Sequence, residues 1–167
     1  NAAQGPTPPV TSLTIKLQDL PAREAAFFAN YFALNAGVSA APGNFVLKGD
    51  ANGIIPVANV SVTNDPVVDG KAATASIMLT FSTPLPDDRF TLTIKDSVVD
   101  PAGNGLDGES NSIQPLTLPT FPSGNGLPGH DFQARFTIDS RPEIANFSAG
   151  SVFVDINGNL QFDPQGL

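Results

Sequence analysis

The chain has 167 residues, with 8 Lys plus Arg against 16 Asp plus Glu, so its formal net charge is −8 and charged residues make up only 14% of it. It has no Cys or Trp and one His, His130. These numbers argue against zinc, iron–sulfur and thiol chemistry and leave little material for side-chain catalysis. They also make nucleic acid and anionic membrane surfaces poor partners. Apolar runs are short, so no membrane insertion is expected.

The amino-terminal third contains a linker, a strand and one unusual segment. Residues 1–9 are rich in Pro and Ala and predict a linker. Val10–Leu17 alternates apolar and polar residues, which predicts a first strand. In Leu20–Leu34, Pro21 suits a first helical position and aromatic residues follow near helical spacing. We expect a short helical insertion there, with a strand over Phe28–Leu34 as the alternative.

The remainder of the chain consists of short β-type segments with turn residues between them. The predicted segments are Phe45–Lys48, Val57–Thr63, Thr74–Phe81, Phe90–Asp96, Leu116–Phe121 and Asp131–Asp139. Alternation with a period of two is clear in Phe90–Ile94, and Asn, Asp, Gly and Pro cluster in the connections. About seven short strands joined in this way predict an all-β fold, an antiparallel β-sandwich over residues 10–140.

Two segments near the carboxyl end are not typical of central strands. Leu118–Gly129 carries three Pro and three Gly and is expected to be a surface crossover before the last strand. Asp139–Glu143 is typical of a module boundary, so residues 141–167 are expected to begin a following segment.

Two segments of residues 45–109 form a recognisable pattern: Pro84–Ile94, a proline turn that leads into a strand, and Asp100–Gly108, which reads DPAGNGLDG. With them, residues 45–109 resemble a bacterial Ig-like module of the Big type. It implies an Ig-like β-sandwich of about seven strands with one helical insertion. It also implies a place among the tandem modules of large bacterial surface or secreted proteins, and hence an extracellular or cell-surface location.

The carboxyl-terminal residues 155–163 resemble the opening of a dockerin-type or EF-hand calcium loop. Ca²⁺ takes 6 to 8 oxygen ligands, and alternate Asp and Asn side chains converge on it when a loop curls. Candidate ligands are the side chains of Asp155, Asn157, Asn159 and Asp163, with the carbonyl of Gln161.

This loop departs from the EF-hand pattern at two positions. Leu160 stands where the pattern has Gly, and Gly166 stands where it has a bidentate Glu. The flanking Ser151–Val154 alternates like a strand, which favours a strand-flanked calcium turn over a helical EF-hand. The alternative is a plain hairpin turn at Asn157-Gly158.

A second acidic loop follows the predicted strand Phe90–Asp96. Its oxygen-bearing residues are Asp96, Asp100, Asn104, Asp107 and Glu109. They are candidates for a second Ca²⁺ site that ties a long strand connection. The alternative is a solvated acidic loop in which Asx side chains cap their own turns.

The bond between Asp163 and Pro164 raises an alternative with covalent chemistry. An Asp carboxylate can attack its own carbonyl carbon, and the proline nitrogen is a good leaving group. A calcium-folded loop that held the two together would therefore favour self-cleavage. However, Asp65-Pro66 and Asp100-Pro101 are the same dipeptide, which is also a common turn initiator.

Three functions follow from these residues. The first is a non-catalytic structural or interaction module, stiffened by Ca²⁺, with adjacent modules of the same long chain as partners. The second is a calcium-dependent self-cleaving module. The third is a module for adhesion to surface proteins or glycans, in which Phe121 or Phe132 of the loop region meets the ligand. The absence of Trp disfavours carbohydrate binding, and twelve Phe fit a core better.

Overall fold

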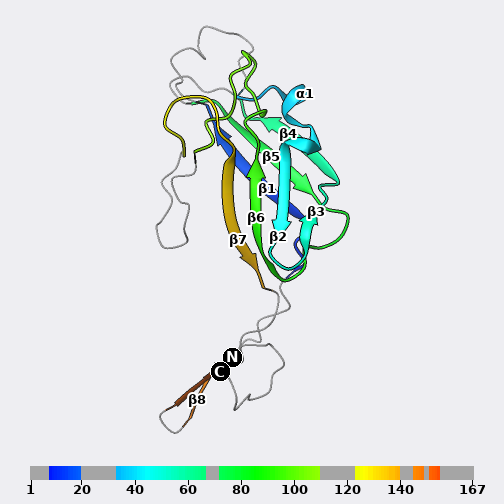
Figure 1. Ribbon diagram of the computed structural model, residues 1–167, viewed down its shortest axis with the longest axis vertical. Coiled ribbons are helices and arrows are strands. Elements are labelled where there is room, and N and C mark those ends of the chain that lie inside the picture. The colour runs from blue at the N-terminus through cyan, green and yellow to red at the C-terminus, as the bar shows by residue number, and fades with distance from the viewer. Residues whose placement is uncertain are drawn as a thin grey trace. The chain divides into compact units, whose positions relative to one another are not determined.

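The computed structural model describes residues 8–19, 33–66, 72–109, 123–139, 145–148 and 151–154. The chain divides into two compact units, one of them Val10–Ile138 and the other Asn1–Pro9 together with Asp139–Leu167. In the second unit the described residues form an antiparallel hairpin of β8 (Ala145–Ser148) and β9 (Ser151–Val154). The first unit is a two-layered β structure (Figure 1).

The first sheet has three strands in the order β1-β5-β4. They are β1 (Ser12–Gln18), β5 (Thr74–Thr80) and β4 (Asn59–Asn64), and both neighbouring pairs are antiparallel. The central strand β5 alternates buried Ala75, Ile77 and Leu79 with residues that face outward. This alternation follows directly from the period of two along a strand.

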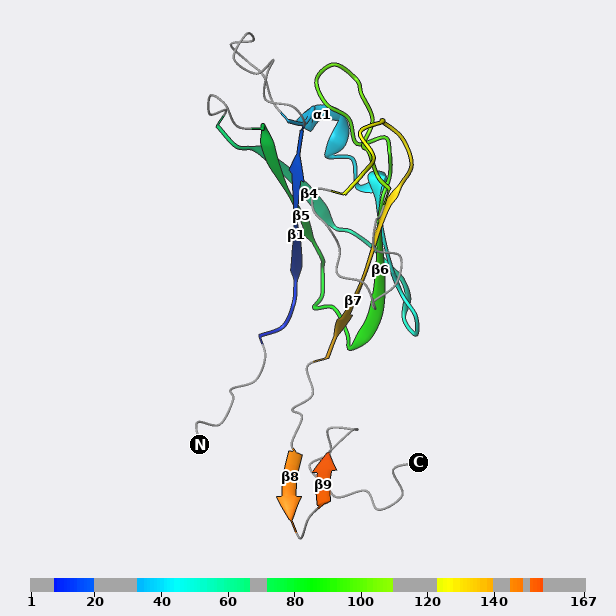
Figure 2. The same ribbon diagram turned by 90° about the vertical axis from the view of Figure 1, so that its left-hand side faces the viewer.

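The second sheet has four strands in the order β3-β2-β6-β7, again all antiparallel. They are β3 (Gly53–Ile55), β2 (Phe45–Gly49), β6 (Asp88–Ile94) and β7 (Phe132–Ile138). Together the sheets confirm the predicted all-β sandwich. Figure 2 views both sheets from their edges and shows them as two layers packed face to face.

The core lies between the two sheets. Leu47, Ile77, Leu79 and Phe90 have no exposed surface. The rings of Phe90 and Phe136 stack with centroids 5.6 Å apart. Burial of these side chains is the main favourable contribution to folding, at about 2 kcal/mol for each large apolar side chain.

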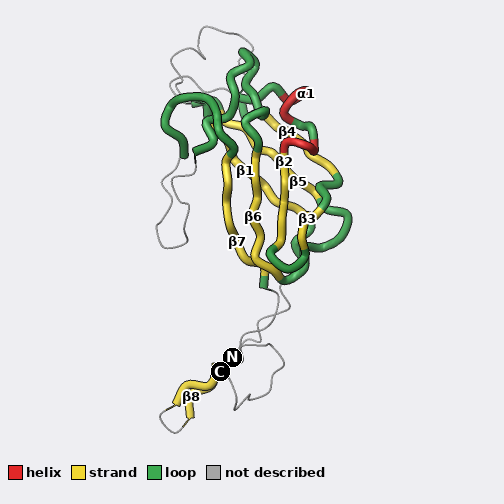
Figure 3. Tube along the Cα trace, viewed as in Figure 1, coloured by secondary structure: helices red, strands yellow, loops and turns green. Residues whose placement is uncertain are grey.

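The sandwich has two dissimilar ends. We call the end that carries the 50–52 turn and the 81–87 connection the hairpin end. The other, the loop end, carries residues 33–44, 95–109 and 123–131, together with the short helical segments α1 (Ala36–Ser39) and η2 (Pro42–Asn44) (Figure 3).

The chain enters and leaves the sandwich at the hairpin end. Ser12 pairs with Thr80, and Ile138 pairs with Asp88, which follows Thr80 after one short connection. The backbone N–H of Leu85 in that connection donates to the carbonyl of Val10 over 2.8 Å. Val10 and Ile138, at which this unit begins and ends, therefore both lie at the end opposite the long loops.

Most predicted strands are confirmed, with boundaries within about two residues. They correspond to β1, β2, β4, β5, β6 and β7, and the strand-like Ser151–Val154 is β9. The short β3 was not predicted, because its three residues are too few to show an alternation of apolar and polar side chains. The expected helix over Leu20–Leu34 falls mostly, and the expected strand over Leu116–Phe121 wholly, outside the described residues. Ala33 and Leu34 are described as a buried bend just before α1. None of the described helices is long and apolar enough to span a bilayer.

Candidate functional site

At the loop end, two segments far apart in sequence run alongside one another. The N–H of Gly129 donates to the carbonyl of Leu106 over 2.8 Å, and the N–H of Gly108 donates to the carbonyl of Gly129 over 3.0 Å. A third bond joins the N–H of Gly124 to the carbonyl of Glu109 over 3.1 Å. These bonds place the 123–130 loop against the side chains of Asp107 and Glu109.

Asp107 is held by the backbone of that loop. Its Oδ1 accepts a hydrogen bond from the N–H of Asn125 at 3.0 Å, and its Oδ2 accepts one from the N–H of Gly126 at 2.6 Å. Gly124 has a positive φ of 104°, and a Cβ there would overlap the Asp107 carboxylate. Glycine is therefore what allows the loop to wrap closely around this side chain.

Glu109 lies next to Asp107 and has one satisfied oxygen and one unsatisfied oxygen. Its Oε1 accepts a hydrogen bond from Nδ2 of Asn125 at 2.9 Å and lies 3.0 Å from Nδ1 of His130. Its Oε2 is buried and has no hydrogen-bond partner among the described residues. A buried acceptor left unpaired costs about 1–3 kcal/mol of stability. A group that bound this oxygen would therefore stabilise the folded chain.

The two carboxyl groups interact directly. Partial burial by itself would raise the pKa of Asp107. The neighbouring Glu109 side chain, the hydrogen bonds from the N–H groups of Asn125 and Gly126, and the nearby His130 outweigh burial and lower that pKa below its usual value. Asp107 is therefore ionised at neutral pH.

The other predicted ligands of this loop form separate groups. Asp100 binds its own turn, since its Oδ1 accepts from the N–H of Asn104 at 2.8 Å and its Oδ2 accepts from Nδ2 of Asn104 at 2.7 Å. The N–H of Asp96 donates to Oδ1 of Asp131 over 3.0 Å. Across the described ranges, no group of three or more His, Asp or Glu side chains is arranged to hold a metal ion. Any ion at Asp107 and Glu109 would need carbonyl oxygens or water to complete its ligands.

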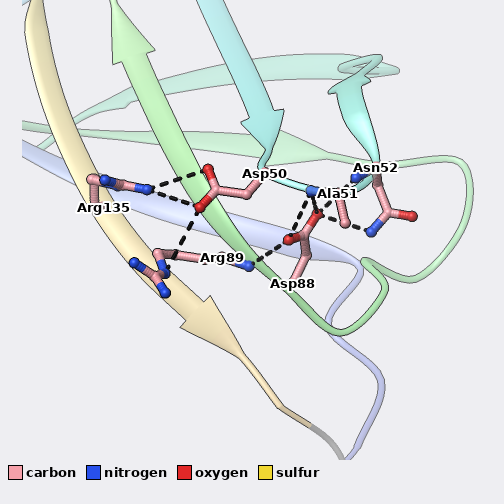
Figure 4. Close-up of polar contacts among 6 residues, drawn as sticks. All are labelled: Asp50, Ala51, Asn52, Asp88, Arg89 and Arg135. Carbon is pink, nitrogen blue, oxygen red and sulfur yellow. Dashed lines mark hydrogen bonds and ion pairs between the residues drawn. The ribbon is translucent and has the colours of Figure 1, made fainter.

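The hairpin end carries a second polar cluster, centred on Asp88 (Figure 4). The Asp88 carboxylate accepts hydrogen bonds from the N–H groups of Ala51 and Asn52, from Nδ2 of Asn52 at 2.9 Å, and from the N–H of Arg89 at 2.7 Å. The side-chain bond from Asn52 is the largest cause of a lowered pKa for Asp88, and the backbone bonds add to it. Asp88 thus closes the turn between β2 and β3.

Asp50 in the same cluster is neutralised by arginines. Nη2 of Arg135 contacts its carboxylate at 3.0 and 3.2 Å, and Nε of Arg89 lies 3.8 Å from Oδ2 (Figure 4). About half of the side-chain surface of Asp50 and Arg135 is exposed. Asp50 and Asn52 thus belong to a turn of the kind expected where Asn and Asp cluster between strands.

The carboxyl-terminal calcium loop lies outside the described residues. This applies to Asp155, Asn157, Asn159, Gln161, Asp163 and Pro164, and Phe121 of the adhesion hypothesis also lies outside them. Phe132, the other aromatic residue of that hypothesis, packs against the core from β7. The structure describes the other two Asp-Pro dipeptides. In the first, the carboxylate of Asp65 accepts a hydrogen bond from Oγ1 of Thr74 at 2.7 Å, and in the second, the carboxylate of Asp100 accepts one from Asn104.

Sequence reasoning did not identify several residues of these clusters. Asn125, His130 and Asp88 were not named as candidates, although each contacts a carboxylate or supplies one. The run Gly124-Asn125-Gly126 was predicted only as part of the surface crossover Leu118–Gly129. Its one usable signal was the alternation of Gly with Asn, which is typical of a backbone that closes on an anionic group.

Scans against family models, curated proteins and solved structures found no match to this chain. The functional proposal that follows therefore depends on the geometry of the two ends and on the residues themselves.

Proposed function

We propose that this chain is a non-catalytic structural or interaction module of a bacterial surface or secreted protein, with an Ig-like sandwich whose loop end binds Ca²⁺. The strand order supports the Ig-like part. The first sheet matches strands B, E and D of an immunoglobulin domain, and the second matches C′, C, F and G. The sequence pattern of Asp100–Gly108 supports the same assignment.

One observation carries the calcium proposal: Oε2 of Glu109 is buried next to ionised Asp107 and has no hydrogen-bond partner among the residues that the structure describes. A divalent cation would neutralise the carboxylate pair and supply the missing partner for Oε2. His130 contacts Oε1 and therefore does not satisfy the same atom. The residues fit a hard cation that prefers oxygen ligands. Asp107 and Glu109 would hold it, together with carbonyl oxygens and water.

The position of this site defines what the ion does. The loop end lies opposite the end at which Val10 and Ile138 lie, since Ser12, Thr80, Asp88 and Ile138 meet at the hairpin end. An ion at Asp107 and Glu109 orders the long loops and the surface they present. Stiffening of a joint between modules is left to the loop 155–163, whose Ca²⁺ binding we propose from its sequence alone.

Thermal unfolding with Ca²⁺ and with a chelator tests the site. At a concentration about 100 times its Kd, a ligand of the folded state stabilises by about 2.7 kcal/mol, which is roughly 10 °C in Tm for a domain of this size. We expect Ca²⁺ to raise the Tm of the wild-type chain. Titration calorimetry gives the stoichiometry, and a mass spectrum before and after checks whether the Asp163–Pro164 bond stays intact.

Glu109→Gln is the most informative variant, because its stability relative to wild type should change in opposite directions in chelator and in Ca²⁺. With a chelator the amide can donate to Asp107 and remove the carboxylate repulsion, so the variant should be more stable than wild type by about 1 kcal/mol. With Ca²⁺ it lacks a charged ligand, so it should gain much less than wild type. Asp50→Asn at the hairpin end is the matched control, since its carboxylate is already paired with arginine.

Two results would contradict the proposal. If Ca²⁺ leaves the wild-type Tm unchanged, the module does not bind the ion. If Glu109→Gln keeps the full shift while Asp155→Asn removes it, the ion binds in the 155–163 loop and the site at Asp107 is wrong.

A further inference from the structure

The two sheets have four edge strands, and they are protected to different degrees. The edges are β1 and β4 in the first sheet and β3 and β7 in the second. β3 has three residues, and β4 is tied at Asn64, whose side chain exchanges hydrogen bonds of 2.9 and 3.0 Å with the backbone of Leu34. β1 and β7 each have seven residues and no Pro, and both lie on the flank that faces the viewer in Figure 2. Long edges of this kind are templates for another strand.

The backbone of β1 presents its even-numbered positions to the open side. The N–H of Phe81 donates to the carbonyl of Thr11, and the N–H of Asp19 donates to the carbonyl of Ala73, both over 2.9 Å. In an antiparallel ladder, bonded and non-bonded pairs alternate, so odd positions of β1 bond to β5. The N–H and C=O groups of Ser12, Thr14, Lys16 and Gln18 therefore point away from β5. Among the described residues, β5 is the only strand paired with β1.

The apolar row of β1 is also incompletely buried. Leu13, Ile15 and Leu17 face inward but keep part of their surface exposed. Their partners on β5, which are Leu79, Ile77 and Ala75, have none. An added strand would cover this row, and each Å² of apolar surface removed from water contributes about 25 cal/mol.

We propose that β1 pairs with β1 of a second copy of this chain, antiparallel and centred on Ile15. In this register Leu13 lies opposite Leu17, Thr14 opposite Lys16, and Ser12 opposite Gln18. Apolar residues meet on the inner face, and no like charges lie opposite one another. The open N–H and C=O groups of the even positions fall opposite one another, as an antiparallel ladder requires. The β1-β5-β4 sheets of the two copies then form one continuous sheet.

β7 is less suited to the same pairing. A fully overlapped antiparallel pair of β7 strands would be centred on Arg135 and would place two guanidinium groups opposite one another. Like charges in directly opposed positions destabilise a pair of strands. Arg135 is also already engaged with Asp50. The self-complementary pattern of β1 therefore selects β1 as the dimer edge.

Sedimentation velocity over about 1 µM to 1 mM protein tests the proposal. We expect a concentration-dependent dimer for wild type and for Thr14→Ala, which keeps the backbone N–H. Thr14→Pro removes an N–H that points away from β5, so it should weaken association by more than about tenfold while the sandwich stays folded. Circular dichroism and the Tm show that the fold is retained.

Cross-linking tests the register independently, since the chain has no cysteine. Ile15→Cys places two thiols in a directly opposed, non-hydrogen-bonded pair, and mild oxidation should give a covalent dimer on a non-reducing gel. Met78→Cys is the control, because Met78 is exposed on β5, which is a central strand. A wild-type chain that stays monomeric throughout, or equal association of Thr14→Pro and Thr14→Ala, would overturn the proposal. Equal cross-linking of the two cysteine variants would overturn the register.

Discussion

The two ends of the sandwich use the same residue types in turns but satisfy them differently. At the hairpin end, Asp88 accepts hydrogen bonds from four N–H groups, and Asp50 is paired with two arginines. At the loop end, Asp107 and Glu109 are neighbours, and one oxygen of Glu109 is buried without a hydrogen-bond partner in the described part of the chain. Acidic turn residues therefore become a candidate site only where the acceptors outnumber the donors around them.

The largest effect is expected from breaking the backbone frame of the loop end at Gly108. A Cβ at this position would overlap backbone atoms of His130, Asp131 and Phe132, which cannot move without separating the paired loops. Gly108→Ala should destabilise the sandwich by about 3 kcal/mol. Chemical denaturation measures this, with Gly43→Ala as the control, since nothing lies within 4 Å of a Cβ there. Equal stability of the two variants would show that the loop frame adapts freely.

A smaller effect, of about 1 kcal/mol, is expected from Asp107→Asn in chelator. The amide keeps one acceptor oxygen, so one of the N–H groups of Asn125 and Gly126 loses its partner. If the two carboxyl groups are coupled, Asp107→Asn with Glu109→Gln should differ from the sum of the single changes. A double-mutant cycle of unfolding free energies measures the coupling, and strict additivity would mean that the carboxyl groups do not interact.

The hairpin end should respond to acid rather than to calcium. The folded-state pKa of Asp88 is below its usual value, so its contribution to stability is present at higher pH and is lost as the pH falls through the folded pKa. Stability of the wild-type chain should therefore fall as the pH drops below the usual Asp pKa of about 4, and Asp88→Asn should flatten this part of the curve. Denaturation at a series of pH values shows it. A variant curve parallel to wild type would contradict the assigned contacts.

The smallest effect belongs to the exposed ion pair of Arg135 and Asp50. Arg135→Gln should cost about 0.5 kcal/mol or less, because roughly half of both side chains is in water. The difference from wild type should shrink in high salt, where exposed charges are screened. Thermal unfolding at low and high salt measures it. A cost of several kcal/mol would mean that this pair supports the fold more than its exposure indicates.

Much of the fold was predictable because the alternation of apolar and polar residues that marks a strand lies within a few consecutive residues. Phe90, Leu92 and Ile94 alternate with Thr, and all three are buried in β6. The short β3 was missed because Gly53-Ile54-Ile55 is too short to show a period, and its place depends on pairing with β2.

The candidate site was predictable only in part. Asp107 and Glu109 were among five expected ligands, but Asp100 and Asn104 form a turn of their own and Asp96 meets Asp131. Asn125 and His130, which contact Glu109, lie in a loop about twenty residues further along the sequence. No spacing rule connects residues that only a long-range backbone bond brings together.

The sequence by itself determined the all-β class, the inward faces of the strands and the exclusion of thiol chemistry, since these depend on composition and on a period of two residues. The tertiary structure decided which acids meet, which edges stay open and where the chain enters and leaves. Each of these depends on how the sheets pair, because pairing fixes neighbours that are far apart along the chain. The charge of −8 and the acidic turns are therefore properties of the sequence, whereas the burial of Oε2 of Glu109 is a property of the fold.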